Sequence, residues 1–318
     1  MAEGTLTPEY RHEPVMLSEV LEQLGLKEGS VACDCTLGGA GQSVELAAAV
    51  GKTGLLIGID QDDMALAAAH GRLDAEAPGI PRKLLKGNFG DLDALLCSAQ
   101  VPGVDGFLFD LGVSSPQLDI PGRGFSYHED APLDMRMDPG NDTLNAAEVV
   151  NTYNEADLAR ILRLYGEEKY AAQIARQIVR RRQERPLATT GDLVEAVKAG
   201  IPAAARRHGG HPARKSFQAI RIEVNGEMDA LEMMLEQALR VLRPGGRLVV
   251  ITYHSLEDRL VKNFMRSGNF TGKPEKDFYG RPRTPWELVV RKAIVPSAEE
   301  TERNPRSRSA KLRAAEKR

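Results

Sequence analysis

The sequence predicts an α/β fold in which a Rossmann-like, doubly wound parallel sheet is interrupted by an all-helical insert. Apolar runs at 31–35, 55–59 and 106–111 alternate with helical patterns, as in right-handed βαβ units. From about residue 145 to 200 the pattern is helical throughout. A β pattern then returns at 247–253. These three observations predict one sheet domain with an insertion.

The elements follow in order. After the strand at 31–35 we expect a helix through Val50, and after the strand at 55–59 a helix over 64–73. Leu84-Leu85 indicates a further strand before a helix at 92–98. In the insert we expect helices at 145–151, 156–165, 169–183 and 192–199. Apolar spacing predicts another over 217–242, bent or broken at Asn225-Gly226. The expected domains are 1–140, a helical insert over 141–213, and 214–318 with a basic C-terminal tail.

Composition excludes several classes of protein. The 318 residues have a formal net charge of −3, which excludes a globally basic nucleic-acid coat. The longest apolar runs fall far short of the ~18–20 residues that span a bilayer, and no signal peptide is visible. Three cysteines, two of them in one apolar run, favour reduced thiols over a disulfide scaffold. We therefore expect a cytoplasmic protein rather than a secreted, membrane-spanning or disordered one.

A glycine-rich turn follows the first strand. It runs from Asp34 through Gly38-Gly39-Ala40-Gly41 to Gln42, where a ligand can approach the backbone closely. It is not the dinucleotide fingerprint, because Val44 stands where that motif has its third glycine. It also lacks the Gly-Lys-Ser/Thr ending of a phosphate loop. Asp34 would repel a pyrophosphate but attract the amino group of a methionyl moiety.

Polar groups at the next strand ends support the same ligand. Asp60 ends the second strand, where an acid can accept both ribose hydroxyls, and Asn88-Phe89 can flank an adenine. Together with Asp110 they favour S-adenosylmethionine (SAM) over NAD. Two alternatives remain open: a glycine turn that only packs a helix onto a strand, and a dinucleotide oxidoreductase.

The segment after Asp110 is expected to face the methyl group, because ligands bind outside the carboxyl ends of parallel strands. Asp110 and the Ser114-Ser115 loop can accept hydrogen bonds from an exocyclic amine. The Asp/Asn-Pro-Pro-aromatic tetrapeptide usual in amino-methyltransferases is missing, so the base-stacking ring must come from elsewhere, for example Phe125 or Tyr127. Carbon-5 methylation is disfavoured because no cysteine stands in a plausible loop.

His254 follows the strand at 247–253, again at the expected catalytic edge. Its imidazole can orient a base or shuttle a proton, since its unperturbed pKa is ~6.5. It can equally cap the helix that follows, as can Ser255. Both interpretations remain open.

Two basic stretches are candidates for contact with RNA phosphates, and a solvated charge run is the alternative. His208 and His211 stand three apart, but their glycine-rich surroundings argue against a metal site, and we expect none. The candidate RNA-binding residues are Arg206, Arg207, Arg214, Lys215 and Arg221 in the first stretch, and Arg306 and Arg308 in the tail.

Several long motifs closely resemble one family, the bacterial ribosomal small subunit methyltransferase H (MraW) family. The matching blocks cover about His12 to Arg313. They are 34–43, 110–119, 123–126, 132–138, 211–213, 217–222, 254–259 and 304–309. This resemblance implies a class I SAM-dependent methyltransferase sheet with a helical insert. It also implies transfer of a methyl group from SAM to N4 of a cytidine in the P-site region of 16S ribosomal RNA.

The resemblance also implies SAM contacts, and the chain departs from the family at a few positions. The implied contacts are Ala40, Gly41, Gln42, Asp60, Phe89, Asp110 and Gln117. Gln42 stands where the family usually has His, Gly39 where it often has Arg, and Lys215-Ser216 where Arg-Thr is common. Two other hypotheses stay open: a DNA amino-methyltransferase, and a SAM-binding RNA or ribosome-assembly factor without catalysis.

Overall fold

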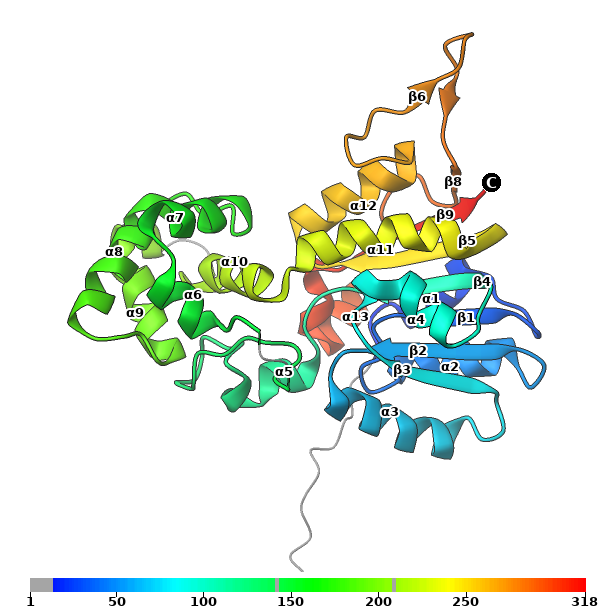
Figure 1. The fold of residues 1–318 in the computed structure, drawn as a ribbon, viewed down its shortest axis with the longest axis horizontal. Helices are drawn as coiled ribbons and strands as arrows, with labels where there is room; N and C mark the ends of the chain where they lie inside the picture. Colours follow the sequence, from blue (N-terminus) through cyan, green and yellow to red (C-terminus); the bar gives the residue numbers. More distant parts are fainter. Residues whose placement is uncertain (1–13, 141–142, 208–209) are drawn as a thin grey trace, which may run out of the picture. The chain divides into compact units, whose positions relative to one another are not determined.

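The fold contains a seven-stranded sheet flanked by helices (Figure 1). The computed structural model describes residues 14–140, 143–207 and 210–318. The strand order is β3-β2-β1-β4-β5-β9-β8. The strands are β1 (Val31–Asp34), β2 (Leu55–Asp60), β3 (Arg82–Lys86), β4 (Val104–Asp110), β5 (Leu242–Thr252), β8 (Trp286–Leu288) and β9 (Lys311–Lys317). The pairs from β3 to β5 are parallel, which confirms the expected α/β class, whereas β9 and β8 are antiparallel.

Helices cover the sheet because their apolar faces need a partner. The helices α1 (Leu17–Leu24), α2 (Gly41–Val50) and α3 (Asp63–Glu76) share one core with the strands. The helix α12 (Ser255–Ser267) packs against β5, β8 and β9. The other elements around the sheet are α4 (Leu92–Ser98), α11 (Glu227–Val241), α13 (Ala298–Arg303), the 3-10 turns η1 (Phe89–Asp91) and η4 (Pro305–Ser309), and the hairpin of β6 (Glu275–Lys276) and β7 (Pro282–Arg283). None of the helices in the described part of the chain is long and apolar enough to cross a bilayer.

The inserted segment has a hydrophobic core of its own. Its elements are α5 (Ser115–Asp119), α6 (Ala146–Thr152), α7 (Glu155–Leu164), α8 (Ala171–Glu184), α9 (Thr190–Gly200), α10 (Arg214–Asn225) and the turns η2 (Pro121–Arg123) and η3 (Ala205–Arg207). Asn145, Asn154 and Thr189 cap α6, α7 and α9 with their side chains. The helices expected over this segment are therefore present, and the chain breaks at Gly226 between α10 and α11.

The chain divides into two compact units at residues other than the expected boundaries. The helical unit is Val113–Met228, and the sheet unit comprises the residues up to Gly112 together with Asp229–Arg318. The helical unit begins before residue 141 because the segment near residue 130 is bound to the start of α9. The Thr190 N–H donates to Ala131 O at 2.8 Å, and the Leu133 N–H donates to Ala188 O at 3.0 Å. It extends beyond residue 213 because α10 contributes Phe217 and Ile220 to its core.

The expected basic C-terminal tail is instead a strand of the sheet. In β9, Leu312, Ala314 and Ala315 are buried, and the strand lies between β5 and β8. Its charged side chains have partners, since Arg313 Nε contacts Asp258 Oδ1 at 2.7 Å and Lys317 Nζ contacts Leu242 O at 2.6 Å. The run of basic residues is therefore not a free tail.

Candidate active site

Three carboxylates end neighbouring strands on one edge of the sheet. Asp34 is the last residue of β1, Asp60 of β2 and Asp110 of β4, and the strand order places β1 between the other two. Because these strands are parallel, their carboxyl ends meet at the same edge. The structure thus places these predicted residues together, as expected.

The glycine-rich loop makes a sharp turn from β1 into α2. Gly38 and Ala40 both adopt positive φ angles, 49° and 59°. For a residue with a Cβ atom this costs on the order of 1–2 kcal/mol, so other contacts must hold Ala40 there. One anchor is the N–H of Gly38, which donates to Asp60 Oδ2 at 2.8 Å. Helix α2 then begins at Gly41, with backbone N–H groups of its first turn facing the loop side.

Asp34 stabilises this loop through hydrogen bonds. Ser43 Oγ donates to its Oδ2 at 2.6 Å, and the Thr36 N–H donates to its Oδ1 at 3.1 Å. Burial raises the pKa of Asp34, and the hydrogen bonds from Ser43 and Thr36 oppose that rise. Asp34 is only 1% exposed, and in this structure its two oxygens accept hydrogen bonds from Thr36 and Ser43; a contact with the ligand stays a prediction.

Asp60 is oriented by two backbone donors. Besides the N–H of Gly38, the N–H of Asp62 donates to Asp60 Oδ1 at 2.9 Å. Burial raises the pKa of Asp60 to about 6, so the group is mainly ionised at neutral pH. Each carboxylate oxygen has a further lone pair, so the group can still accept two hydroxyl hydrogen bonds.

Asp110 forms a hydrogen bond with a residue that sequence analysis did not select. Tyr253, just after β5, donates its hydroxyl to Asp110 Oδ1 at 2.7 Å. Burial raises the pKa of Asp110 to about 7, while hydrogen bonds from Tyr253 and Gln42 oppose that rise. Burial also raises the pKa of Tyr253, which therefore stays a neutral donor. The sequence indicates that Asp110 and Tyr253 both follow strands of the sheet. Residue spacing does not reveal that those strands, β4 and β5, are neighbours or that the two side chains meet.

Gln42 and Phe89, both predicted to contact the cofactor, make different kinds of contact within the protein. Gln42 is 7% exposed and donates to Val15 O at 3.1 Å as well as bonding Asp110, so its amide is engaged within the protein. Phe89 opens η1 after β3, half-buried, with its ring edge-on to Phe109 at 6.1 Å between centroids. Phe89 is therefore placed to flank a planar group at this edge.

His254 caps helix α12. Its Nδ1 accepts a hydrogen bond from the N–H of Glu257 at 3.4 Å, and its Nε2 lies 3.0 Å from Glu257 Oε1. Of the two interpretations left open by the sequence, the structure shows the cap.

Ser114, Ser115 and Gln117 belong to the helical unit, at the start of α5. The side chain of Gln117 accepts a hydrogen bond from the Ser114 N–H at 2.9 Å, and it is 6% exposed. Gln117 therefore stabilises the first turn of α5. The sequence predicted a cofactor contact for this residue but not this structural role.

The two aromatic candidates for base stacking differ in their surroundings. Phe125 is buried in the core of the helical unit, so its ring is not available. Tyr127 is half-buried and stacks on His211, with centroids 4.5 Å apart and planes 8° from parallel. His208 lies outside the described residues, so the pair with His211 considered above is not described.

The motif at 132–138 is structural. Arg123 donates to Met137 O at 2.9 Å, and the Met137 N–H donates to Asn225 Oδ1 at 2.8 Å. Asn225 also donates to Met135 O at 2.8 Å. These bonds tie the segment to the end of α10 within the helical unit.

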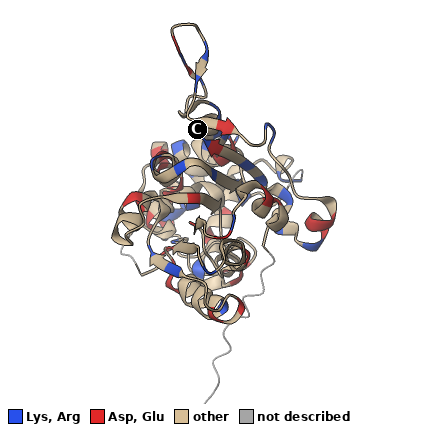
Figure 2. Ribbon diagram, turned by 90° about the vertical axis from the view of Figure 1, so that its right-hand side faces the viewer, with Lys and Arg blue, Asp and Glu red and all other residues tan. Residues whose placement is uncertain are grey.

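The candidate RNA-binding residues differ in exposure and in their partners. Arg206, Arg207, Arg214, Arg306 and Arg308 are exposed, as is Lys215, whose Nζ contacts Glu167 O at 2.9 Å. Arg221 instead forms a two-pronged ion pair with Glu227 at 2.7 Å, both side chains being largely buried, so we remove it from the candidates. Figure 2 shows basic and acidic segments interspersed in that view rather than gathered into one basic area.

The donor set at the strand ends fits SAM. The carboxylate of Asp60 has further lone pairs that suit ribose hydroxyls, and helix α2 begins in the loop, where backbone N–H groups suit a ligand carboxylate. The family model described as the MraW methylase family matches residues 9–318. The chain belongs to this methylase family.

Its relatives cover almost the whole chain. "Ribosomal RNA small subunit methyltransferase H" of a Paenibacillus species is 52% identical, over 97% of this chain and 99% of the relative. The proteins of the same name from Symbiobacterium thermophilum and Brevibacillus brevis are 51% and 48% identical. The two matches cover 97% and 98% of this chain and 97% and 99% of the respective relative. The expected family and methyltransferase class are confirmed, and the methyl donor is SAM.

Replacing Tyr253 by phenylalanine is expected to move the pH dependence of this MraW-family enzyme. Without the hydroxyl, the ionised form of Asp110 loses a hydrogen bond and its pKa rises from about 7. The midpoint of the kcat–pH profile should move to higher pH by about one unit, since hydrogen bonds to charged groups are worth ~1.5–3 kcal/mol. A profile unchanged between pH 6 and 9 would contradict this. Tyr279→Phe, an exposed tyrosine in the β6–β7 hairpin segment, is the control.

Proposed function

We propose that the protein methylates the exocyclic N4 amine of a cytidine in the P-site region of 16S ribosomal RNA. The position of Asp110 carries the proposal: it ends the central strand β4 and receives a hydrogen bond from Tyr253 at 2.7 Å. Names of relatives about 50% identical support ribosomal RNA of the small subunit as the substrate. The cytoplasm, where that RNA is assembled into subunits, is the expected location.

The site residues divide the work between binding and proton transfer. Asp60 accepts the ribose hydroxyls, Phe89 flanks the adenine, and the loop at Gly38–Gly41 receives the methionyl end. When bound, SAM supplies a methyl carbon attached to a positively charged sulfur. The proposal includes no metal, because positive charge disappears from that sulfur as the methyl group leaves.

Asp110 prepares the amine. The lone pair of cytosine N4 is delocalised into the ring, so the amine is a weak nucleophile until a hydrogen-bond acceptor polarises it. The carboxylate of Asp110 accepts one N–H, and it takes that proton as the new N–C bond forms and the S–C bond breaks. A pKa of about 7 suits a group that must be ionised before the reaction and protonated after it. Tyr253 holds the carboxylate in place through Oδ1, and the carboxylate has further lone pairs with which to accept the amine N–H.

Nucleoside mass spectrometry tests the proposal directly. Small subunits and naked 16S RNA from cells lacking the gene would be incubated with the protein and SAM, with Asp110→Asn in parallel. We expect N4-methylcytidine with the unaltered protein alone. Methylation of another nucleoside, or none in either substrate while SAM still binds, would reject the proposal. The second result would favour a SAM-binding assembly factor, and methylation of DNA cytosine would favour a DNA enzyme.

A further inference from the structure

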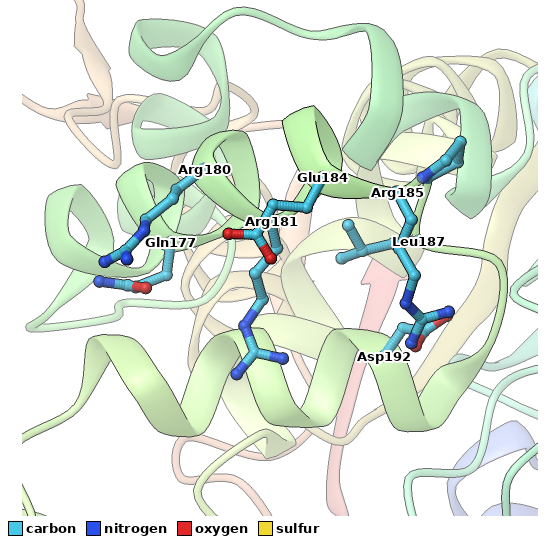
Figure 3. A pocket seen from close by; sticks show the side chains of 8 residues that line it. Gln177, Arg180, Arg181, Glu184, Arg185, Leu187 and Asp192 are labelled. Atoms are coloured by element: carbon cyan, nitrogen blue, oxygen red, sulfur yellow. The ribbon is translucent and has the colours of Figure 1, made fainter.

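A shallow pocket lies in the helical unit, next to α8 and the start of α9 (Figure 3). Its volume is about 470 Å³. The lining residues are Gln177, Arg180, Arg181, Glu184, Arg185, Pro186, Leu187 and Asp192. Three of these eight are arginines, and Figure 3 shows their side chains around the opening. We call this feature the arginine pocket.

The face of α8 that lines the pocket is not needed for the core. Gln177, Arg180, Arg181 and Glu184 are three or four residues apart, so they share one side of the helix. The buried side chains of α8, such as Ile174 and Ile178, belong to the hydrophobic core instead. The packing of α8 therefore does not require the basic residues on this surface.

The two acids of the pocket do not neutralise all three arginines. Asp192 neutralises Arg185, with which it pairs at 2.5 Å, and it also accepts a hydrogen bond from the Ala188 N–H at 3.0 Å. This leaves Arg180 and Arg181 against the exposed Glu184. Other arginines of α8 have different partners, since Arg182 donates to Val150 O and Arg176 lies 3.7 Å from Glu155. Positive charge in the pocket therefore concentrates at Arg180 and Arg181.

The neighbouring helix α9 carries a neutralised pair beside the pocket. Lys198 Nζ lies 2.9 Å from Glu195 Oε1, and this hydrogen bond lowers the pKa of Glu195, which the charges of Lys198, Arg181 and Arg206 lower further. The unbalanced positive charge is therefore that of Arg180 and Arg181 in the pocket itself.

We propose that the arginine pocket binds a phosphate of the substrate RNA backbone and so positions the RNA on the helical unit. The guanidinium group matches a phosphate with two parallel N–H donors, and the lining of the pocket supplies three such groups. Such contacts fix the position of the RNA without reading its sequence. This inference rests on the proposed function, because it takes ribosomal RNA as the substrate.

The test compares two double variants with the same loss of charge. Arg180→Gln/Arg181→Gln alters the pocket, while Arg163→Gln/Lys169→Gln alters exposed residues of the helical unit that do not line it. Binding to naked 16S RNA would be measured by filter binding at several salt concentrations. We expect the pocket variant to bind about tenfold more weakly. The plot of log Kd against log salt should become shallower by roughly 0.7 to 0.9, the contribution of the one phosphate contact that is lost. The control should change less than twofold.

The outcomes separate this inference from the proposed function. Weaker RNA binding by the pocket variant alone, with SAM affinity and kcat at saturating RNA unchanged, supports it. Equal RNA affinity and salt dependence of the two double variants would overturn it, even if the unaltered enzyme methylates 16S RNA. Loss of binding to assembled subunits but not to naked RNA would also overturn it, indicating a ribosomal protein as the partner. The single variant Arg180→Gln, at an exposed site, guards against a folding defect in the double variant.

Discussion

Asp110→Asn is expected to lower kcat for RNA methylation by about 10²- to 10⁴-fold, the usual range for losing a general base. Asparagine keeps the shape and can still accept the hydrogen bond from Tyr253, but it cannot take a proton. The rate of the unaltered enzyme should rise with pH through about 7 and level off above it, as Asp110 becomes ionised. In the Asp110→Asn variant this rise of the rate with pH should vanish. Single-turnover rates between pH 5.5 and 9 would measure both effects.

Stability measurements show whether the variant is simply misfolded. The pKa of Asp110 is raised in the folded protein, so folded molecules keep a proton that unfolded ones release above about pH 4. Its ionisation therefore reduces the free energy of unfolding as pH rises from about 4 to 7, with little further change above. Asp110→Asn should remove this pH-dependent loss of stability. At pH 8 the variant should be at least as stable as the unaltered protein. An exposed-site control, Asp229→Asn, should keep both the activity and the pH dependence. Near-normal kcat in a folded Asp110→Asn variant would refute the role of Asp110.

Asp60→Ala is expected to raise the Kd for SAM by about 10- to 100-fold, because hydrogen bonds to a charged group are worth ~1.5–3 kcal/mol. Part of the loss comes from the ribose hydroxyls. The rest comes from the loop, whose Gly38 N–H loses its acceptor. Isothermal titration with SAM would measure the change. Asp63→Ala, at an exposed neighbouring position on α3, is the control.

A ligand lacking a ribose hydroxyl separates the two contributions. The unaltered protein should bind the 2′-deoxy analogue of SAM more weakly than SAM, whereas Asp60→Ala should bind the two about equally. If the variant still discriminates as strongly as the unaltered protein, Asp60 does not contact the ribose and serves only to anchor the loop.

The sequence predicts the parallel half of the sheet well because each strand there is a short apolar run ending in a polar residue. Asp34, Asp60 and Asp110 could be assigned to one edge for that reason alone. Strand β9 was wrongly predicted to be a tail because its buried positions include the small residues Ala314 and Ala315, between charged ones. No apolar pattern marks it, and its place depends on ion pairs such as Arg313 with Asp258, far apart in the sequence.

The site was predicted less completely than the fold, because its contacts join distant residues. The hydrogen bond between Tyr253 and Asp110 spans 143 positions, and no local spacing indicates it. Gln42, Gln117 and Arg221 have the residue types expected of ligand contacts, but in the structure they bond within the protein. Residue spacing does not single out any arginine of α8, whereas the pocket beside α9 distinguishes Arg180 and Arg181.

The divided sheet unit imposes an order on how this protein emerges from the ribosome. Strand β4 ends at Asp110, and its partner β5 begins only at Leu242. At ~5–20 residues per second, β4 waits roughly 6 to 26 seconds after its own synthesis for that partner. The α7, α8 and α9 contacts of the helical unit are local in sequence, so they form quickly within this interval. The nascent chain therefore carries a finished helical unit beside an open strand edge, which is the point most exposed to misassociation.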